Sequence, residues 1–424
     1  MAKKQFEQLL ERTLPPGWEQ KATELKAFVR ARKICSPAEL IRMILIYLTC
    51  GKSFGITSVL MRLLGYADIK KVAVYKRMVK CGDWLKWLCG NIYRHAGYLA
   101  EKPAWLEGWN VVAVDASEDA KGGKACQYYM LHYCLDLFTL SVRELLVTTR
   151  KVGEKLSNFT LFKKGDLVMG DRVYSSIAGI EHLKGLLADF ILRLRSNSFY
   201  LYVSPGQVLD LLSYLSGLKV GEDVDLQAFY LHNGKYKPVR VCARRKDGVK
   251  EEAGKRRLAR ENSRKQRGEV SEVQEGYNKY IIVVTSLGPE VSAMQILELY
   301  RLRWQIEIAF KRLKTLFGYD DLPMMQSTNA ITWFYGKLLV AALCETLVNK
   351  GRAEAEKVSG EKSAALPCLS LWRELQTALS LLSPILLERL LEIDLWVLIS
   401  RLSALCADSK RKRVPQLHSF GLRF

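Results

Sequence analysis

Histidine is scarce in this sequence, and neither histidine nor cysteine is clustered. The 424 residues include 5 histidines, and the 10 cysteines occur singly, without a CxxC pair. Zinc sites are built from closely spaced cysteine and histidine ligands, so the sequence excludes a zinc site of the usual kind. A metal ion bound to this protein should instead be held by carboxylate oxygens, which favours Mg²⁺ or Mn²⁺.

Long uninterrupted hydrophobic runs are also missing. The two most apolar stretches, Leu40–Cys50 and Leu381–Ala407, are short or are broken by arginine and acidic residues. A membrane-spanning helix needs about 20 consecutive apolar residues, so neither stretch predicts one. The first residues of the chain lack the apolar segment of a secretion signal. These features predict a cytoplasmic protein without a membrane partner.

Acidic residues are outnumbered by basic ones. There are 44 aspartates and glutamates against 65 lysines and arginines, which gives a net charge of +21. Such an excess indicates a polyanionic partner, and without a membrane signal that partner is nucleic acid. A chain of this length can form two to four domains with a well-buried core.

Residues 1–105 have the pattern of an all-helical region. Two short helices are predicted at Ser53–Leu64 and Val72–Met78, and their close spacing is typical of a helix-turn-helix that binds DNA. The basic residues on or beside the second helix are the candidate DNA contacts: Lys70, Lys76 and Arg77. The alternative is a small helical bundle whose lysines only keep it soluble.

Residues 106–199 change to a strand-like pattern. Apolar runs predict neighbouring strands at 109–117, 126–137 and 141–149, then a helix at 153–162, a strand ending at Asp171, a helix at 175–187 and a strand at 188–196. Neighbouring strands followed by alternating helices and strands predict a mixed α/β sheet with both faces covered.

Two apolar runs of this region end in an acid, Asp115 and Asp171. Chemistry in α/β sheets gathers at strand ends, where side chains emerge from a rigid scaffold, so both are candidate catalytic residues. Other acids could take these places. The rivals are Glu118 and Asp119 for the first, and Asp136 and Asp166 for the second.

Residues 200–285 have the character of an insertion. Alternating apolar residues predict β-strands, and a strongly basic run at 246–268 separates them. That run could be a solvated, partly flexible loop, or it could clamp DNA phosphates; we favour the clamp in a basic, DNA-binding chain.

Residues 286–350 contain a predicted helix from Ser292 to Gly318. Ser292 and Gln295 form a capping-box pattern, and Gly318 is a typical helix end. One face of the helix combines an aromatic residue, a carboxylate and cations: Tyr300, Arg303, Glu307, Lys311 and Lys314. On helix physics alone these could be solvent-exposed ion pairs four residues apart. An apolar helix at 328–348 is predicted to pack on the core, and the helices of 351–424 could mediate self-association.

The spacing of Tyr300, Arg303, Glu307 and Lys314 resembles the YREK signature of DDE transposases of the insertion-sequence-four family. Asp171-Arg172-Val173-Tyr174 is similar to the Asp-Arg-x-Tyr motif of that family. The resemblance covers roughly residues 105–350. It implies an RNase H-like catalytic core with an inserted, mainly β subdomain, flanked by all-α N- and C-terminal regions.

The resemblance also implies a site and a reaction. Asp115, Asp171 and Glu307 would be the catalytic residues and would bind two Mg²⁺ ions, with Mn²⁺ as a substitute. Tyr300, Arg303, Lys314, Arg172 and Tyr174 would contact double-stranded DNA at the element ends and target. Lys311, one turn from Glu307, is a further candidate by its place on the helix alone. Hairpin-forming relatives carry a tryptophan in the insertion, whereas residues 200–285 contain none. A homodimer acting near the bacterial nucleoid is expected. A structure-selective nuclease and a non-catalytic, transposase-derived regulator are the alternatives.

Overall fold

The computed structural model describes residues 4–51, 53–93, 102–120, 128–195, 198–264, 269–323, 327–359 and 368–389. These residues form two compact units. A helical unit is drawn from residues 1–92, 325–352 and 368–424, and a sheet unit from residues 93–324 and 353–367. Each unit is treated by itself below.

The described part of the helical unit consists of helices, as the sequence predicts for its N-terminal part. The helices are α1 (Gln5–Thr13), α2 (Trp18–Glu24), α3 (Pro37–Ile46) with a π-helical end at Tyr47–Gly51, α4 (Phe54–Leu63), α5 (Lys71–Val79), α6 (Gly82–Tyr93), α13 (Ser327–Ser359) and α14 (Cys368–Leu386). The predicted helix pair at residues 53–78 corresponds to α4 and α5. Most of the C-terminal region, residues 390–424, lies outside the described residues.

Helix α13 differs from its predicted position. The sequence predicted that residues 328–348 pack on the mixed sheet, but the helix belongs to the helical unit. The Cys89 thiol donates to the Tyr335 carbonyl at 3.3 Å, and Lys337 donates to the Leu48 carbonyl at 3.1 Å. Within the described residues, Asn329–Arg352 is one helix long and apolar enough to cross a membrane, and 67% of its most apolar stretch is buried in the protein. Packing against other helices accounts for its apolar sequence.

The sheet unit is built on one mixed sheet. Its strands are β1 (Asn110–Ala120), β2 (Tyr128–Asp136), β3 (Val142–Thr149), β4 (Asp166–Gly170), β5 (Asp189–Arg193), β6 (Tyr202–Ser204), β7 (Gln207–Val208), β8 (Asp223–His232), β9 (Lys235–Arg245) and β10 (Tyr280–Thr285). They lie in the order β3-β2-β1-β4-β5-β10-β9-β8-β6-β7. β1, β4 and β5 are parallel and the remaining pairs are antiparallel. This is the mixed α/β class that the sequence predicts, and it is consistent with an RNase H-like core.

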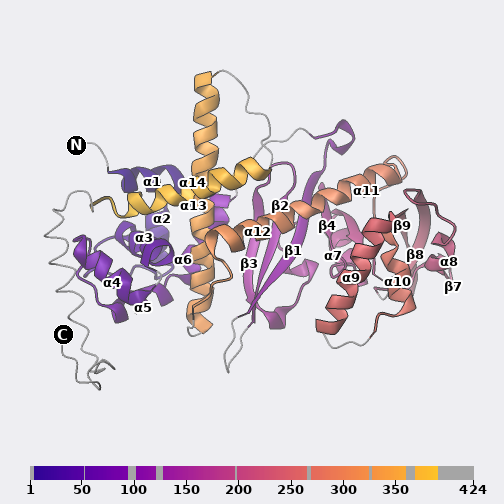
Figure 1. Ribbon diagram of the computed structural model, residues 1–424, viewed down its shortest axis with the longest axis horizontal. Helices are drawn as coiled ribbons and strands as arrows, with labels where there is room; N and C mark the ends of the chain where they lie inside the picture. Colours follow the sequence, from indigo (N-terminus) through magenta and orange to yellow (C-terminus); the bar gives the residue numbers. More distant parts are fainter. Residues whose placement is uncertain are drawn as a thin grey trace. The chain divides into compact units, whose positions relative to one another are not determined.

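Helices cover the sheet. The sheet unit contains α7 (Ile177–Gly185), α8 (Leu211–Leu215), α9 (Gly248–Arg264), α10 (Glu272–Asn278), α11 (Ala293–Arg301) and α12 (Gln305–Phe317), with 3₁₀ turns at Ala104–Leu106, Arg150–Val152, Leu156–Asn158 and Leu302–Trp304. Figure 1 shows α11 and α12 running across the sheet over β1 and β4. Apolar side chains of β1, β4, β5, β9 and β10 form a continuous buried core with α7 and α8.

One local prediction was wrong, and one alternative left open by the sequence is excluded. The predicted helix at 153–162 is replaced by the 3₁₀ turns at Arg150–Val152 and Leu156–Asn158, because Gly153 adopts a positive φ of 70° that interrupts helical geometry. The basic run was weighed as a flexible loop, but Gly248–Arg264 is the helix α9. Alanine, lysine, arginine and glutamate all favour helix, and they dominate this segment.

The predicted insertion contains strands, but they do not form a sheet of their own. β10 pairs with β5 on one side and with β9 on the other, so the strands of residues 200–285 continue the sheet that carries β1 and β4. Side chains from β9 also hold the chain that leads into α11.

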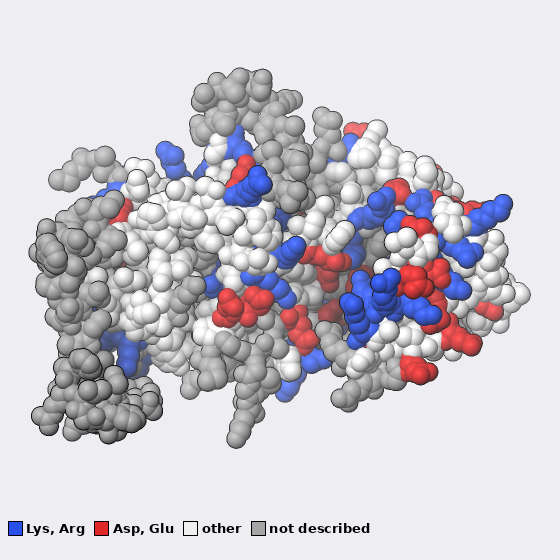
Figure 2. Space-filling model, in the orientation of Figure 1, with Lys and Arg blue, Asp and Glu red and all other residues white. Residues whose placement is uncertain are grey.

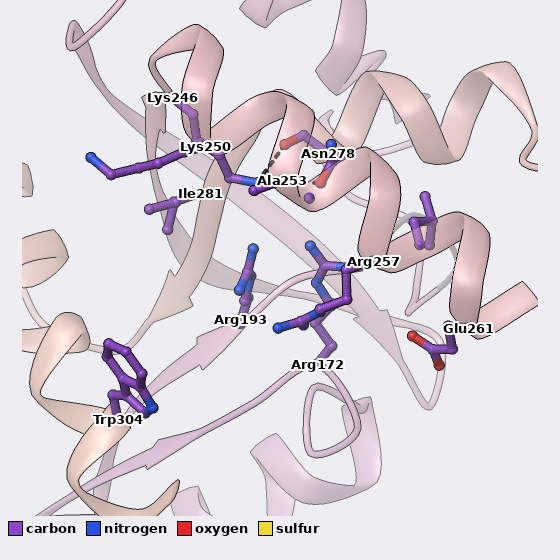
Figure 3. A pocket seen from close by; sticks show the side chains of 12 residues that line it. Arg172, Arg193, Lys246, Lys250, Ala253, Arg257, Glu261, Asn278, Ile281 and Trp304 are labelled. Atoms are coloured by element: carbon purple, nitrogen blue, oxygen red, sulfur yellow. Dashed lines mark hydrogen bonds between the residues drawn. The ribbon is translucent and has the colours of Figure 1, made fainter. Parts of the chain in front are cut away.

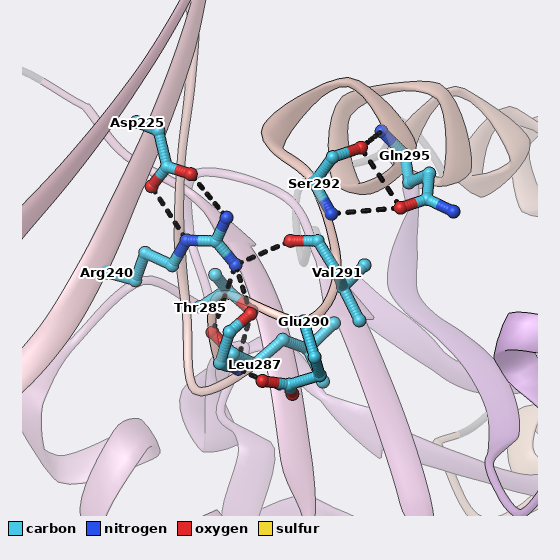
Figure 4. Close-up of polar contacts among 9 residues, drawn as sticks. Asp225, Arg240, Thr285, Leu287, Glu290, Val291, Ser292 and Gln295 are labelled. Atoms are coloured by element: carbon cyan, nitrogen blue, oxygen red, sulfur yellow. Dashed lines mark hydrogen bonds and ion pairs between the residues drawn. The ribbon is translucent and has the colours of Figure 1, made fainter.

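Arg240 on β9 anchors the loop between β10 and α11 (Figure 4). Its guanidinium group is paired with Asp225 and donates to the carbonyl oxygens of Leu287, Gly288 and Val291, the last at 2.7 Å. The side chain is 3% exposed. The next residue after this loop, Ser292, begins α11 with the predicted capping box. The position of α11 is therefore set by a buried arginine from β9.

Candidate catalytic site

Asp115 and Asp171 emerge from adjacent strands at the same level of the sheet. The parallel pairing of β1 with β4 ends at Val114 and Gly170, and each aspartate is the next residue. The prediction that Asp115 ends its strand was wrong, because β1 continues to Ala120 in a long antiparallel pair with β2. What ends beside Asp115 is β4, and this leaves both acids at the same edge.

The helix that carries Glu307 is bent rather than continuous. The predicted single helix is divided into α11 and α12 by the 3₁₀ turn at Leu302–Trp304, and Gly318 ends α12 in the left-handed conformation as predicted. The buried Tyr300 hydroxyl donates to the carbonyl oxygen of Gly170 at 3.3 Å, which holds the end of α11 against the end of β4. Leu302, in this turn, is 39% exposed although it is apolar.

Arg303 connects the acids of two elements. Its guanidinium group lies 3.3 Å from an Asp115 carboxylate oxygen and 2.6 Å from a Glu307 carboxylate oxygen. The Arg303 side chain is 12% exposed and that of Asp115 is 16% exposed, whereas Glu307 is 45% exposed. Residues separated by almost 190 positions in the chain thus meet in one partly buried group. We call Asp115, Asp171, Glu307 and Arg303 the acid cluster.

The electrostatics of this cluster centre on Asp115. Burial, reinforced by the negative charge of Asp171, raises the pKa of Asp115 to about 7, although Arg303 opposes the shift. A carboxylate in this position is costly to ionise without a nearby cation. The positive charge of Arg303 therefore does not fully offset the cost of ionising Asp115.

The rival acids have structural roles. Asp166 is fully buried and paired with Arg143 at 2.7 Å. Asp136 accepts hydrogen bonds from the backbone of Phe138 and Thr139 in the turn after β2. Glu118 is paired with Arg150 at 3.1 Å on the surface, and the side chain of Asp119 lies outside the described residues.

The donor atoms are suited to divalent ions, but they are not gathered into a ligand cluster. Among the residues that the structure describes, no three acid, histidine or cysteine side chains are grouped closely enough to hold a metal ion. Asp115, Asp171 and Glu307 offer the oxygen ligands that Mg²⁺ and Mn²⁺ take. The largely buried Asp115 carboxylate, whose pKa is raised, would be stabilised by such an ion. In this structure the nearest positive charge is the guanidinium group of Arg303.

The predicted DNA contacts differ in accessibility. Lys311 is exposed and Lys314 and Arg172 are partly exposed, so these cations can reach a ligand. Tyr174 is 1% exposed and Tyr300 is 6% exposed, so both rings pack in the interior, contrary to the predicted DNA contacts. In the helical unit Lys70 and Lys76 are exposed, whereas Arg77 is partly buried with its guanidinium group 6.0 Å from the Phe28 ring centre.

The fold brings together cations that the sequence indicated separately, Arg172 and members of the basic run at 246–268, with one that sequence reasoning missed, Arg193. A cavity of about 490 Å³ is lined by Arg172, Arg193, Lys246, Lys250, Ala253, Gly254, Arg257, Leu258, Glu261, Asn278, Ile281 and Trp304 (Figure 3). We call this cavity the basic pocket. Figure 2 shows lysine and arginine side chains gathered over α9, next to acidic side chains toward β4. The signal for Arg193 was an arginine within the apolar strand β5; the others are brought there only by the fold.

Comparisons with known proteins agree with this arrangement. Residues 102–343, more than half of the chain, match the family model described as a transposase DDE domain. The chain is 27% identical over 342 residues to the InsL protein for insertion sequence element IS186A of Escherichia coli (strain K12), covering 79% of this chain and 91% of the relative. It is 27% identical over 343 residues to the transposase for insertion sequence element IS421 of Escherichia coli, with the same two shares.

The mixed sheet with its covering helices is consistent with an RNase H-like transposase core. The chain belongs to the transposase DDE domain family. Its function is accordingly that of a transposase, a DNA-cleaving and strand-transferring enzyme. The predicted membership of the DDE transposases is thereby confirmed.

Proposed function

We propose that this protein is the transposase of an insertion sequence of the insertion-sequence-four family. It binds the ends of its element, cleaves DNA strands there and transfers them into target DNA. The observation that carries the proposal is the cluster in which Arg303 contacts Asp115 and Glu307 beside the strand that ends at Asp171. Family membership alone would not assign these three acids.

Asp115, Asp171 and Glu307 would hold two divalent ions, Mg²⁺ with Mn²⁺ as a substitute. When bound, such ions lower the pKa of an attacking water or 3′-hydroxyl and neutralise charge on the leaving oxygen. The protein's own contribution is position. β1 and β4 would fix the two aspartates, and α12, which follows the capped α11 held through Tyr300, would present Glu307 to them.

Arg303 would change partners during the reaction. Its planar guanidinium group can contact two phosphate oxygens at once. When divalent ions neutralise the carboxylates, Arg303 could therefore pair with a DNA phosphate instead. Lys314, Lys311 and Arg172 would hold phosphates near the cleaved strand. Tyr300 and Tyr174 are buried and would act by positioning the ends of the β-strands that carry the aspartates.

The remaining assignments concern partners and organisation. The basic residues at and on α5 in the helical unit, Lys70, Lys76 and Arg77, would recognise the element ends. We propose residues 1–105 as the DNA-binding region, 106–199 and 286–350 as the catalytic core, 200–285 as its basic extension and 351–424 as a region of self-association. A homodimer on DNA in the bacterial cytoplasm, at the nucleoid, fits coordinated cutting of two ends.

The test is cleavage of labelled DNA carrying the element's own ends in the presence of Mg²⁺. Glu307→Gln should lower the cleavage rate by about three orders of magnitude, roughly 4 kcal/mol, because a neutral amide is a poor metal ligand. End binding should be unchanged. Asp320→Asn is the matched control, since it removes an exposed acid just beyond α12 and should cleave normally.

Several outcomes would contradict the proposal. Normal cleavage by Glu307→Gln would mean that the acid is misassigned. Hydrolysis without strand transfer would indicate a nuclease on the same fold. Protection of end DNA without metal-dependent nicking would indicate a regulator.

A further inference from the structure

The basic pocket gathers cations from four separate segments. Arg172 follows β4, Arg193 ends β5, Lys246 follows β9 and Arg257 lies on α9. Figure 3 shows the guanidinium groups of Arg172, Arg193 and Arg257 directed toward a common space, with the acid Glu261 farther along α9. Such convergence from distant parts of the chain is a product of the fold and not of local sequence.

These cations are not neutralised by the protein. Among the described residues, Arg172, Arg193 and Arg257 are not in an ion pair with a carboxylate, and the Nε atom of Arg172 is buried without a partner; the nearby charge of Asp171 acts on Arg172 and Arg193 without pairing with them. Burial and repulsion from Arg193 and Arg257 lower the pKa of Arg172 to about 10. Arg257 is exposed, but Arg172 and Arg193 are partly buried, and buried polar groups are normally paired, so these two in particular favour an external anion.

Lys246 completes the set in a different way. Its ammonium group donates to the Asn278 carbonyl and lies 3.4 Å from the Asn278 side-chain oxygen, both of which are uncharged. A neutral partner orients the lysine but leaves its charge available. The pocket thus holds a fixed, directed ammonium group beside three guanidinium groups.

The other walls of the pocket are apolar. Ile281 and Leu258 line it, and Trp304 from the 3₁₀ turn between α11 and α12 is 64% exposed. Tryptophan is enriched at interfaces, and an exposed indole ring can pack against a sugar or stack on a base of a bound nucleotide. A phosphate held by the cations could therefore be attached to a nucleotide resting on this wall.

We propose that the basic pocket binds the terminal phosphate of a DNA strand. A cavity of about 490 Å³ accepts a ligand the size of one nucleotide but not a duplex. A terminal phosphate carries a charge of about −1.5 to −2 at neutral pH, which matches several converging cations better than the single charge of an internal phosphodiester. The proposal rests on the proposed function only for DNA as the source of the phosphate.

The pocket differs from the acid cluster in its residues. Asp171 and Arg172 are consecutive, as are Arg303 and Trp304, so a strand end in the pocket would lie close to the acids. The pocket would hold a strand terminus while the acids act on another bond. Residues Arg193, Lys246 and Arg257 are thereby assigned to DNA-end binding.

The experiment measures binding of the full-length protein to short single-stranded oligonucleotides in EDTA, by fluorescence anisotropy. The oligonucleotides carry a phosphate at the 5′ end, at the 3′ end or at neither. One phosphorylated form should bind about tenfold more tightly than the unphosphorylated form, because charge-assisted hydrogen bonds to a dianion are strong. Inorganic phosphate should compete and remove the preference.

Two variants assign the preference to the pocket. Arg257→Ala and Lys246→Met should each reduce it at least several-fold. Arg256→Ala is the matched control, because Arg256 is the exposed neighbour of Arg257 on α9, carries the same charge and does not line the pocket. It should weaken binding of all three oligonucleotides equally and leave the preference intact. Thermal unfolding of each variant confirms that it is folded.

Equal binding of all three oligonucleotides by the unchanged protein would overturn the proposal, as would an equal loss of preference in Arg256→Ala. The outcome is separable from the proposed function, because no metal is present. A preserved preference in a protein that does not cleave DNA would contradict the proposed function alone. Normal cleavage without a phosphate preference would contradict the pocket alone.

Discussion

The acid cluster and the basic pocket are adjacent, yet they treat charge in opposite ways. In the acid cluster Arg303 lies between Asp115 and Glu307, so the protein balances part of the negative charge itself. In the basic pocket Arg172, Arg193 and Arg257 face one another without a compensating acid among their described contacts. In the first site a cation of the protein contacts the acids directly, whereas in the second the guanidinium groups have no carboxylate paired with them among the described residues.

Removing Arg303 should have the largest effect on this difference. Arg303→Ala leaves Asp115 buried without its cation, and we expect the free energy of unfolding at pH 8 to fall by about 3 kcal/mol in metal-free protein. The loss should be much smaller at pH 5, because Asp115, with a pKa near 7, is then protonated and needs no partner. Urea denaturation at the two pH values measures both quantities.

Divalent ions sharpen the same experiment. Mg²⁺ should restore more stability to Arg303→Ala than it adds to the unchanged protein, because the ion takes the place that the guanidinium group occupied. Arg303→Lys should behave more like the unchanged protein. An equal stability loss at pH 5 and pH 8, or no added response to Mg²⁺, would show that Arg303 is only a packing residue.

Lys246 should give a smaller effect of opposite sign. Burial, then the charges of Arg193, Arg172 and Arg257, lower its pKa to about 8, while Glu251 opposes the shift. The unfolded chain then binds more protons than the folded protein between pH 8 and the ordinary lysine pKa of 10.5, so the free energy of unfolding rises with pH across that window. Below pH 8 the full cost of the buried charge is present.

Lys246→Met should remove this rise. At pH 7 the variant should be more stable than the unchanged protein by on the order of 1 kcal/mol, and the difference should shrink by pH 10. Chemical denaturation at pH 7, 8.5 and 10 follows the difference. A constant difference across this range would mean that the lysine is not held near other cations.

Arg257 should give the smallest change. Because it repels Arg172, Arg193 and Lys246, Arg257→Ala should raise the free energy of unfolding by about 0.5 kcal/mol at low ionic strength. The gain should vanish in 0.5 M salt, because at that salt concentration charges more than roughly 5 Å apart are screened from one another. Arg256→Ala should show neither the gain nor its salt dependence. A loss of stability in Arg257→Ala would show that the pocket is already neutralised.

Much of the fold was predictable because its signals are local. The apolar runs that end at Asp115 and Asp171 predicted two of the strands, and the capping box at Ser292 predicted the start of α11. Their meeting at one level of the sheet follows from the parallel pairing of β1 and β4, which the structure supplies and the strand pattern did not specify. The assignment of Glu307 depended on a family signature, since helix periodicity alone would equally allow a solvent-exposed ion pair.

Other features depend on packing between distant segments. The 3₁₀ turn at Leu302–Trp304 exposes Leu302 and Trp304, which a regular helix pattern could not indicate. The continuation of the sheet through β10 required a partner, β5, nearly 90 residues earlier in the chain. The basic pocket has four contributing segments, and although the basic run and Arg172 were noted in the sequence, their meeting with Arg193 could not be predicted from it.

The anchoring of α11 by Arg240 has a mechanical consequence. The loop before α11 accepts hydrogen bonds from Arg240 of β9 through its carbonyl oxygens. Arg244 of the same strand is paired with Glu298 farther along α11. β9 also leads directly into α9, whose arginine and lysine residues face the cavity. The strand β9 therefore connects the helix that lines the basic pocket with the helix that precedes Glu307, so a substitution at Arg240 or Arg244 should disturb both sites at once.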